Sequence, residues 1–251
     1  MAGAALPGRL SWQVTRVLEL VEETPQATTI VLEAPDWPGY RAGQHIDVRL
    51  TAEDGYQAQR SYSIASAPED PHLALTVERI ADGEVSPYLL DELRAGDELE
   101  LRGPIGGYFA WDGSLGGPLM LLAGGSGVVP LRSMLRHHAA AADSVPVRLL
   151  YSSRAWEEVI YRDELRRLGD GGSDSPTVEF TLTRAWPADW DGHRGRIDRA
   201  LLAEVCWAPA DRPLIYICGP NGFVETAAAT MVQLGHEPQR IRTERFGPSG
   251  T

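Results

Sequence analysis

The spacing of hydrophobic positions changes near the middle of the chain. In residues 1–113, short segments alternate apolar and polar positions, the pattern of half-buried strands, and turn sequences such as APDWPGYRAG and APEDP separate them. The predicted strands cover 11–20, 28–34, 43–50, 59–66, 72–80 and 97–103. One helix is predicted over 86–96, with Ser86 as its cap and Gly96 at its end. Six short strands and one helix predict a closed antiparallel β-barrel.

The second half alternates strands with helices. Predicted strands cover 117–125, 145–153, 177–185, 212–220 and 240–246, and predicted helices cover 128–142, 157–169, 196–206 and 221–235. The strands are too apolar for a solvated face, so this half is predicted to be an α/β domain with a parallel sheet covered on both faces. WDGSLGGP at 111–118 separates the two patterns, which predicts domains at 1–113 and 114–251.

The charge of the chain limits its partners. The net charge of −12 argues against binding to nucleic acid or to an anionic membrane. Residues 1–113 carry 8 Arg against 19 Asp and Glu, a net charge of −11, whereas residues 114–251 carry 15 Arg against 16 Asp and Glu, a net charge of −1. The second half therefore tolerates a polyphosphate ligand better.

Two cysteines, Cys206 and Cys218, exclude a disulfide framework and a Cys-ligated metal centre within this chain, so we expect no metal. No apolar run approaches the roughly 18 residues of a membrane span. The start, MAGAALPGRL, lacks the basic and apolar regions of a signal peptide. We expect a cytoplasmic monomer.

Two motifs follow strands at the same edge of the predicted parallel sheet. AGGSGVVP at 123–130 lies between the first strand and its helix, where glycines and free helix N–H groups suit a pyrophosphate. It is not a full G-x-G-x-x-G, because Pro130 replaces the last glycine, and an ordinary tight turn is the alternative. CGP at 218–220 ends a buried strand at a strand-to-helix junction, which favours a role for Cys218 in the site. For Cys206 we expect a role in core packing.

Five motifs occur in order: RSYS (60–63), GEVSPYL (83–89), GPIGGYF (103–109), GGSGVVP (124–130) and CGP (218–220). Over about residues 10–246 the chain resembles the ferredoxin–NADP⁺ reductase superfamily, most closely the bacterial branch that also supplies the reductase parts of oxygenases and nitric oxide dioxygenases. The resemblance implies a flavin-binding barrel followed by a Rossmann-like NADP-binding domain.

The resemblance implies FAD bound along the barrel. Arg60 would pair with flavin-side phosphates, Tyr62 would pack against the isoalloxazine or ribityl region, and Ser63 would lie near flavin N5. A surface ion pair for Arg60 and a core position for Tyr62 are the alternatives. The implied FAD-binding residues are Arg60, Ser61, Tyr62, Ser63, Val77, Glu78, Arg79, Gly83, Val85, Ser86 and Phe246.

NADP(H) is the second implied cofactor. Ser153 and Arg154 lie at the end of the second parallel strand, where an Asp or Glu would be expected if the site bound a ribose 2′-hydroxyl. A hydroxyl and a guanidinium favour a 2′-phosphate instead. The alternative for Arg154 is a solvated surface side chain. The implied NADP-binding residues are Gly125, Gly127, Val128, Pro130, Ser153, Arg154, Tyr161, Arg162, Cys218, Gly219 and Pro220.

The resemblance also implies four catalytic residues, namely Ser63, Cys218, Glu244 and Phe246. Phe246 would stack on the flavin face that the nicotinamide must reach, although five residues follow it here and plant-type members end on the aromatic. Glu244 would assist protonation or stabilise reduced flavin, with a surface carboxylate as the alternative.

The implied reaction is hydride transfer from NADPH to FAD, followed by electron transfer to a separate acceptor such as ferredoxin. We expect a separate carrier because no iron–sulfur module is fused to the chain. Two alternatives remain open: a reductase of free flavin, quinone or ferric iron, and a flavin-bearing electron-transfer subunit of a larger complex.

Overall fold

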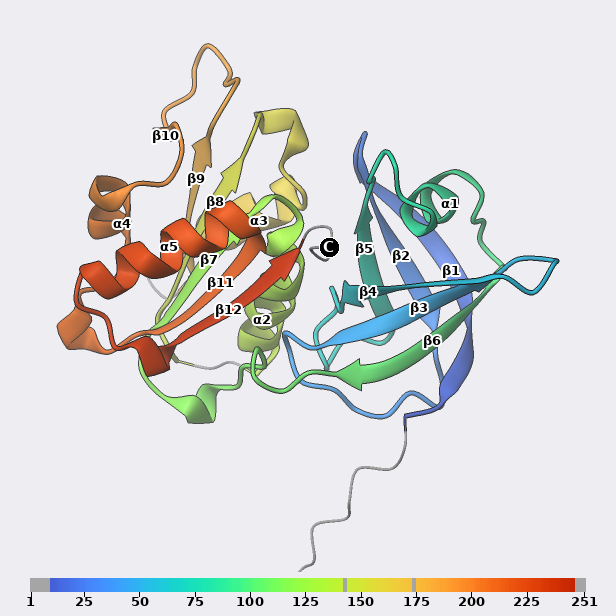
Figure 1. Ribbon diagram of the computed structural model, residues 1–251. Helices are drawn as coiled ribbons and strands as arrows, with labels where there is room; N and C mark the ends of the chain where they lie inside the picture. Colours follow the sequence, from blue (N-terminus) through green and yellow to red (C-terminus); the bar gives the residue numbers. More distant parts are fainter. Residues whose placement is uncertain (1–9, 142–143, 173–174, 247–251) are drawn as a thin grey trace, which may run out of the picture.

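The computed structural model describes residues 10–141, 144–172 and 175–246. It consists of two domains that lie side by side (Figure 1). Residues 1–9, which include most of the segment MAGAALPGRL, lie outside the described residues. The five residues after Phe246 also lie outside them. Within the described ranges, no helix combines the length and the hydrophobicity that a membrane span requires.

The first domain is the predicted antiparallel barrel. Its strand order is β4-β3-β6-β1-β2-β5, and every neighbouring pair runs antiparallel. A bridge between Ile64 and Leu75 joins the ends of this order. The elements are β1 (Trp12–Thr24), β2 (Ala27–Glu33), β3 (His45–Thr51), β4 (Gln57–Ser63), β5 (Leu73–Glu78), α1 (Val85–Asp91) and β6 (Glu98–Ile105). The alternation of apolar positions therefore predicted the strands and the fold class correctly.

The second domain is the predicted parallel sheet, with strand order β10-β9-β8-β7-β11-β12. Its strands are β7 (Leu119–Gly124), β8 (Val147–Ser153), β9 (Thr177–Leu182), β10 (His193–Arg194), β11 (Leu214–Pro220) and β12 (Ile241–Phe246). Its helices are α2 (Val128–Ala140), α3 (Arg162–Gly169), α4 (Arg199–Val205) and α5 (Asn221–Gln233). The two-residue strand β10 had no recognisable pattern in the sequence.

Helices cover both faces of this sheet. Leu131 and Met134 of α2 share one buried cluster with Leu121 of β7, and this cluster continues into the barrel through Ala65 and Ala74. On the other face, residues of α4 and α5 pack against alternate positions of the same strands. The face that carries α2 is consequently the face that contacts the barrel.

The connector between the domains follows β6 and contains a short 3₁₀ turn at Gly113–Leu115. Trp111 is buried against His137 and His138 of α2, and the Tyr216 hydroxyl donates to the Ala110 carbonyl at 2.8 Å. The predicted boundary at 113/114 falls in this connector.

Two helices differ from the prediction. The helix predicted over 157–169 is a 3₁₀ turn at Trp156–Glu158 followed by α3, and Tyr161 between them has a left-handed backbone with φ of 59°. β-branched Val159 and Ile160 disfavour a continuous helix at this point. α1 begins at Val85, so Ser86 is not its cap; its hydroxyl instead accepts from the Ile80 N–H at 3.0 Å.

Candidate active site

The glycine loop and the CGP motif meet at the carboxyl edge of the parallel sheet. A Cβ on Gly127 would lie 2.0 Å from the Cys218 carbonyl oxygen, and one on Gly219 would lie 2.9 Å from the Gly124 carbonyl oxygen. These glycines are required for packing between the two strand ends. Gly125 differs, because its φ is +54° and nothing lies within 4 Å of its Cβ position. The backbone at the start of α2, which continues through Val128 and Pro130, is therefore open to a ligand at Gly125.

Ser63 ends β4 with a hydroxyl that has no partner among the residues that the structure describes. Its side chain is 4% exposed, and its Oγ makes no hydrogen bond within the described part of the chain. A buried hydroxyl without a partner costs free energy, so such groups usually have a bound molecule or a functional role. This orphaned hydroxyl fits the polar edge of a flavin ring. Directly opposite Ser63 in the antiparallel ladder lies His45 of β3.

Glu244 and Cys218 lie beside each other on β12 and β11 and face the barrel. One Glu244 carboxylate oxygen is 3.5 Å from His45 Nδ1, and the other is buried without a partner among the described residues. Burial, together with the nearby Glu244 carboxylate, raises the pKa of the Cys218 thiol well above its usual value. Cys218 is therefore a neutral thiol. Ser63, His45, Glu244 and Cys218 form a continuous row from the barrel to the parallel sheet.

Phe246 is the last described residue and lies opposite Pro220 in the ladder between β12 and β11. It is half-buried and packs against the cluster on the barrel-facing side of the sheet. The structure therefore brings all four residues predicted to be catalytic to the junction between the domains.

The rest of RSYS divides into surface and interior positions. Arg60 is exposed, donates to the Gln59 carbonyl at 2.7 Å and lies 3.4 Å from the Glu84 carboxylate. Ser61 donates to Asp47 at 2.6 Å. Tyr62 is partly buried against the barrel core, and burial raises its pKa to about 12. Arg60 is thus available to an anionic ligand, whereas the hydroxyl of Ser61 is engaged within the barrel.

The predicted backbone contacts to FAD lie at the end of β5 and the start of α1. Val77 and Val85 are buried in the barrel core, so only their backbone could reach a ligand. The Arg79 guanidinium forms a two-bond pair with Asp91. Gly83, two residues before α1, is partly exposed, and its N–H donates to the Ile80 carbonyl at 2.9 Å.

Glu78, Arg79 and Arg154 line one crevice between the domains, of about 200 Å³. Arg154 is 63% exposed, and its only ion pair in the described ranges is with Glu158 at 4.0 Å. Its carbonyl accepts from the Arg184 N–H at 2.9 Å, which places a second arginine beside it. An exposed guanidinium with so loose a partner is free to bind phosphate.

Three other predicted nucleotide residues lie nearby. Ser153 is buried and donates to the Ala155 carbonyl at 3.2 Å. Arg162 lies over the Trp156 ring at 5.8 Å. Tyr161 is 3% exposed, and its hydroxyl bonds Thr76 of the barrel, so it does not reach the edge that carries Arg154. We therefore place Tyr161 outside the nucleotide site.

Two residues of the site were missed by the sequence reasoning. His45 belongs to it because β3 pairs with β4 in a register that sets it opposite Ser63. Arg184 is a further candidate because it follows β9, the neighbour of β8, and its backbone N–H bonds the Arg154 carbonyl at the same sheet edge. The second could have been found from the sequence, since carboxyl ends of parallel strands share one edge. Among the described residues, no group of three or more His, Cys, Asp or Glu side chains is arranged to hold a metal ion.

A barrel and a parallel sheet that share one junction of polar and glycine residues define a two-domain oxidoreductase for dinucleotide cofactors. Residues 19–110 match the oxidoreductase FAD-binding domain, and residues 121–229 match the oxidoreductase NAD-binding domain. FAD and a nicotinamide dinucleotide are therefore its cofactors.

The chain belongs to the ferredoxin–NADP reductase superfamily. It is 36% identical to ferredoxin–NADP reductase B of Sorangium cellulosum, with 82% of this chain and 85% of the relative covered. It is 31% identical to the ferredoxin reductase component of 3-ketosteroid-9-alpha-monooxygenase from Mycobacterium tuberculosis, covering 92% of this chain and 64% of the relative.

A ferredoxin NADP⁺ reductase from Neisseria gonorrhoeae, solved with bound FAD and NADP, superposes with a TM-score of 0.79. The two chains are 25% identical, and the match covers 93% of this chain and 98% of that one. Several of the curated relatives are longer, and the chain spans 63–64% of their length.

Proposed function

We propose that this protein takes hydride from NADPH onto FAD and passes the electrons to a separate protein acceptor such as a ferredoxin. The proposal rests on the row Ser63, His45, Glu244 and Cys218 at the domain junction, where two buried polar atoms have no hydrogen-bond partner among the described residues. A flavin ring edge on the barrel side and a nicotinamide on the sheet side would give these atoms partners.

Each residue of the row has a separate role in this proposal. The Ser63 hydroxyl would donate a hydrogen bond to the bound flavin. Cys218, neutral because of its raised pKa, provides an uncharged wall against the nicotinamide. Glu244 and His45, 3.5 Å apart, can move a proton between the flavin edge and solvent. The redox chemistry, both acceptance of hydride and release of electrons, would be supplied by FAD held by these residues.

The phosphates of the two cofactors would lie on different elements. Arg60, exposed on β4, would bind the FAD phosphates by charge-assisted hydrogen bonds. The N–H groups at the open glycine Gly125 and at the start of α2 would receive the pyrophosphate of NADPH. Arg154 and Arg184 would receive its 2′-phosphate, which supports NADPH over NADH.

The acceptor can be identified by comparing electron carriers. We expect NADPH oxidation by the FAD-loaded protein to accelerate when purified ferredoxin is added, with cytochrome c reduction as the reporter. Relatives named as ferredoxin reductases and oxygenase reductase components support a protein acceptor. Ferric chelates and free FMN serve as comparison acceptors at matched concentration. Faster turnover with either small acceptor than with any ferredoxin would contradict the proposed partner.

A further inference from the structure

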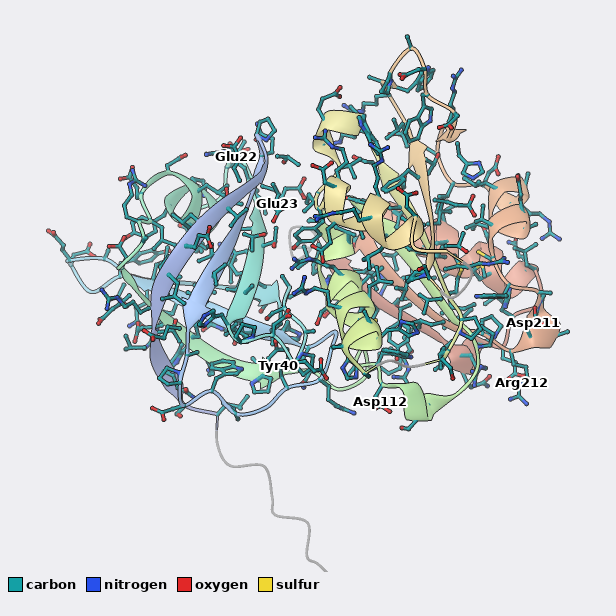
Figure 2. The ribbon with its side chains drawn as sticks, turned by 180° about the vertical axis from the view of Figure 1, so that it is seen from behind. Glu22, Glu23, Tyr40, Asp112, Asp211 and Arg212 are labelled. Atoms are coloured by element: carbon teal, nitrogen blue, oxygen red, sulfur yellow. The ribbon has the colours of Figure 1, made fainter. Side chains whose placement is uncertain are left out.

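Behind the candidate active site, one side chain of the second domain reaches into the barrel. The Tyr161 hydroxyl forms a hydrogen bond with the hydroxyl of Thr76 on β5. Thr76 lies directly opposite Thr29 of β2, and their hydroxyls are 2.8 Å apart. Thr29 in turn donates to the Glu23 carboxylate at 2.6 Å. Figure 2 shows Glu23 near the end of β1, on the side of the barrel that faces the second domain.

The direction of these hydrogen bonds is set by the carboxylate. Because Thr29 donates its single proton to Glu23, Thr76 donates to Thr29 and Tyr161 donates to Thr76. The Tyr161 side chain is consequently tied to the barrel through a chain of hydrogen bonds that ends at the Glu23 carboxylate.

The backbone of Tyr161 is itself unusual. A φ of 59° is rare for a bulky residue and persists only where the surroundings determine it. The Arg132 guanidinium lies over the Tyr161 ring at 4.3 Å and bonds Glu164 at 2.8 Å. The ring is thus held between α2, α3 and the barrel.

Helix α2 makes a second group of contacts with the barrel. Arg132 donates to the Ala65 carbonyl at 3.1 Å, and Ser133 donates to the Ser66 carbonyl at 2.6 Å. Arg136 binds both carboxylate oxygens of Asp70 at 2.9 and 2.6 Å. The same helix begins at the glycine loop, so these contacts fix that loop relative to the barrel.

Both flavin-facing strands are therefore bonded to the nucleotide domain. Thr76 immediately precedes Val77, Glu78 and Arg79, and Ala65 and Ser66 follow shortly after Ser63. We propose that Tyr161, through its bond to Thr76, is a positioning residue that sets how the nucleotide domain approaches the flavin-binding strands. It acts on alignment and binds no nucleotide. The inference rests on the proposed function, because the alignment concerned is that of nicotinamide against flavin.

Three variants isolate the bond. Tyr161→Phe keeps the ring beneath Arg132 and removes only the hydroxyl, Thr76→Val removes the barrel partner at constant shape, and Thr76→Ser retains a hydroxyl. Since small misplacements of reacting groups lower rates steeply, the first two should each slow hydride transfer at saturating NADPH about tenfold. Thr76→Ser should stay close to the wild-type rate. The double variant Tyr161→Phe/Thr76→Val should be no slower than Thr76→Val alone, because Thr76→Val already removes the Tyr161–Thr76 bond together with the bond from Thr76 to Thr29.

A binding measurement separates positioning from nucleotide binding. Calorimetry with 2′-phospho-AMP should give dissociation constants for Tyr161→Phe and wild type that agree within about twofold. The KM for NADPH should also differ by no more than about twofold. A weakened dissociation constant with an unchanged hydride-transfer rate would make Tyr161 a nucleotide ligand and overturn the inference. A lowered melting temperature with unchanged hydride transfer would make the bond merely structural and overturn it too.

The failure of the proposed function is a separate outcome. A wild-type protein that fails to bind FAD, or to be reduced by NADPH, would refute the proposed function and this inference together. A wild type that is reduced, with variants that match it in rate, would refute the inference alone.

Discussion

Ser63→Ala should slow the reduction of bound FAD by NADPH about 100-fold, the scale observed when a hydrogen-bond donor aimed at a reacting centre is removed. The same substitution should leave the apoprotein equally stable or more stable. Within the described ranges the Ser63 hydroxyl is buried without a hydrogen-bond partner, and such a group costs about 1–3 kcal/mol in the folded state. Stopped-flow measurement of flavin absorbance gives the rate, and denaturant unfolding gives the free energy of unfolding.

Ser66→Ala is the matched control for this prediction. The Ser66 hydroxyl accepts from the Ala74 N–H at 3.0 Å and lies 2.8 Å from the Tyr40 hydroxyl. Its removal should lower the free energy of unfolding and leave flavin reduction at the wild-type rate. If Ser63→Ala instead behaved like Ser66→Ala, the Ser63 hydroxyl would be a structural group of the barrel.

Arg154→Ala should lower kcat/KM for NADPH about 10–150-fold and leave the value for NADH nearly unchanged. The two nucleotides differ only in the 2′-phosphate, and a hydrogen bond to a charged group contributes about 1.5–3 kcal/mol, with about 1.4 kcal/mol for each factor of ten. The loss should appear in KM, since the phosphate is remote from the hydride and binds equally in the ground and transition states. High salt should reduce the wild-type preference, because Arg154 is exposed.

Arg167→Ala provides the control for charge alone. Arg167 is exposed on α3 and donates to the Asp163 carbonyl at 3.0 Å. Its removal should therefore change kcat/KM for neither NADPH nor NADH. If Arg154→Ala lowered kcat/KM equally for NADPH and NADH, Arg154 would contact a part of the nucleotide that both share. A wild type that prefers NADH would contradict the 2′-phosphate site.

Local spacing was enough to predict most of the fold. Alternating positions in β1 to β6 and the apolar strands β7, β8 and β11 record which faces are buried, and burial is what forms the two sheets. The helix predicted over 157–169 was wrong for a local and a tertiary reason. β-branched Val159 and Ile160 disfavour a helix, and Tyr161 is held by Thr76 and Arg132, which come from distant parts of the chain.

Residues of the candidate site could likewise be predicted from local motifs but not from tertiary contacts. Ser63, Cys218 and the glycine loop could be predicted because each lies within a short motif beside a strand end. His45 could not, because its place depends on the pairing of β3 with β4 and on Glu244 approaching from the other domain. Tyr161 was assigned to the nucleotide because it follows β8, and only the packed domains show that it faces the barrel.

One anaerobic titration determines whether the protein is an FAD enzyme that NADPH reduces. The apoprotein is titrated with FAD and, in parallel, with FMN, and NADPH is then added to the loaded protein while visible flavin absorbance is recorded. We expect FAD to bind in preference to FMN, because Arg60 and the N–H groups at the start of α1 would offer partners to a pyrophosphate, and we expect NADPH then to bleach the bound flavin. A protein that binds no FAD, or whose bound FAD keeps its absorbance after NADPH is added, would contradict this expectation.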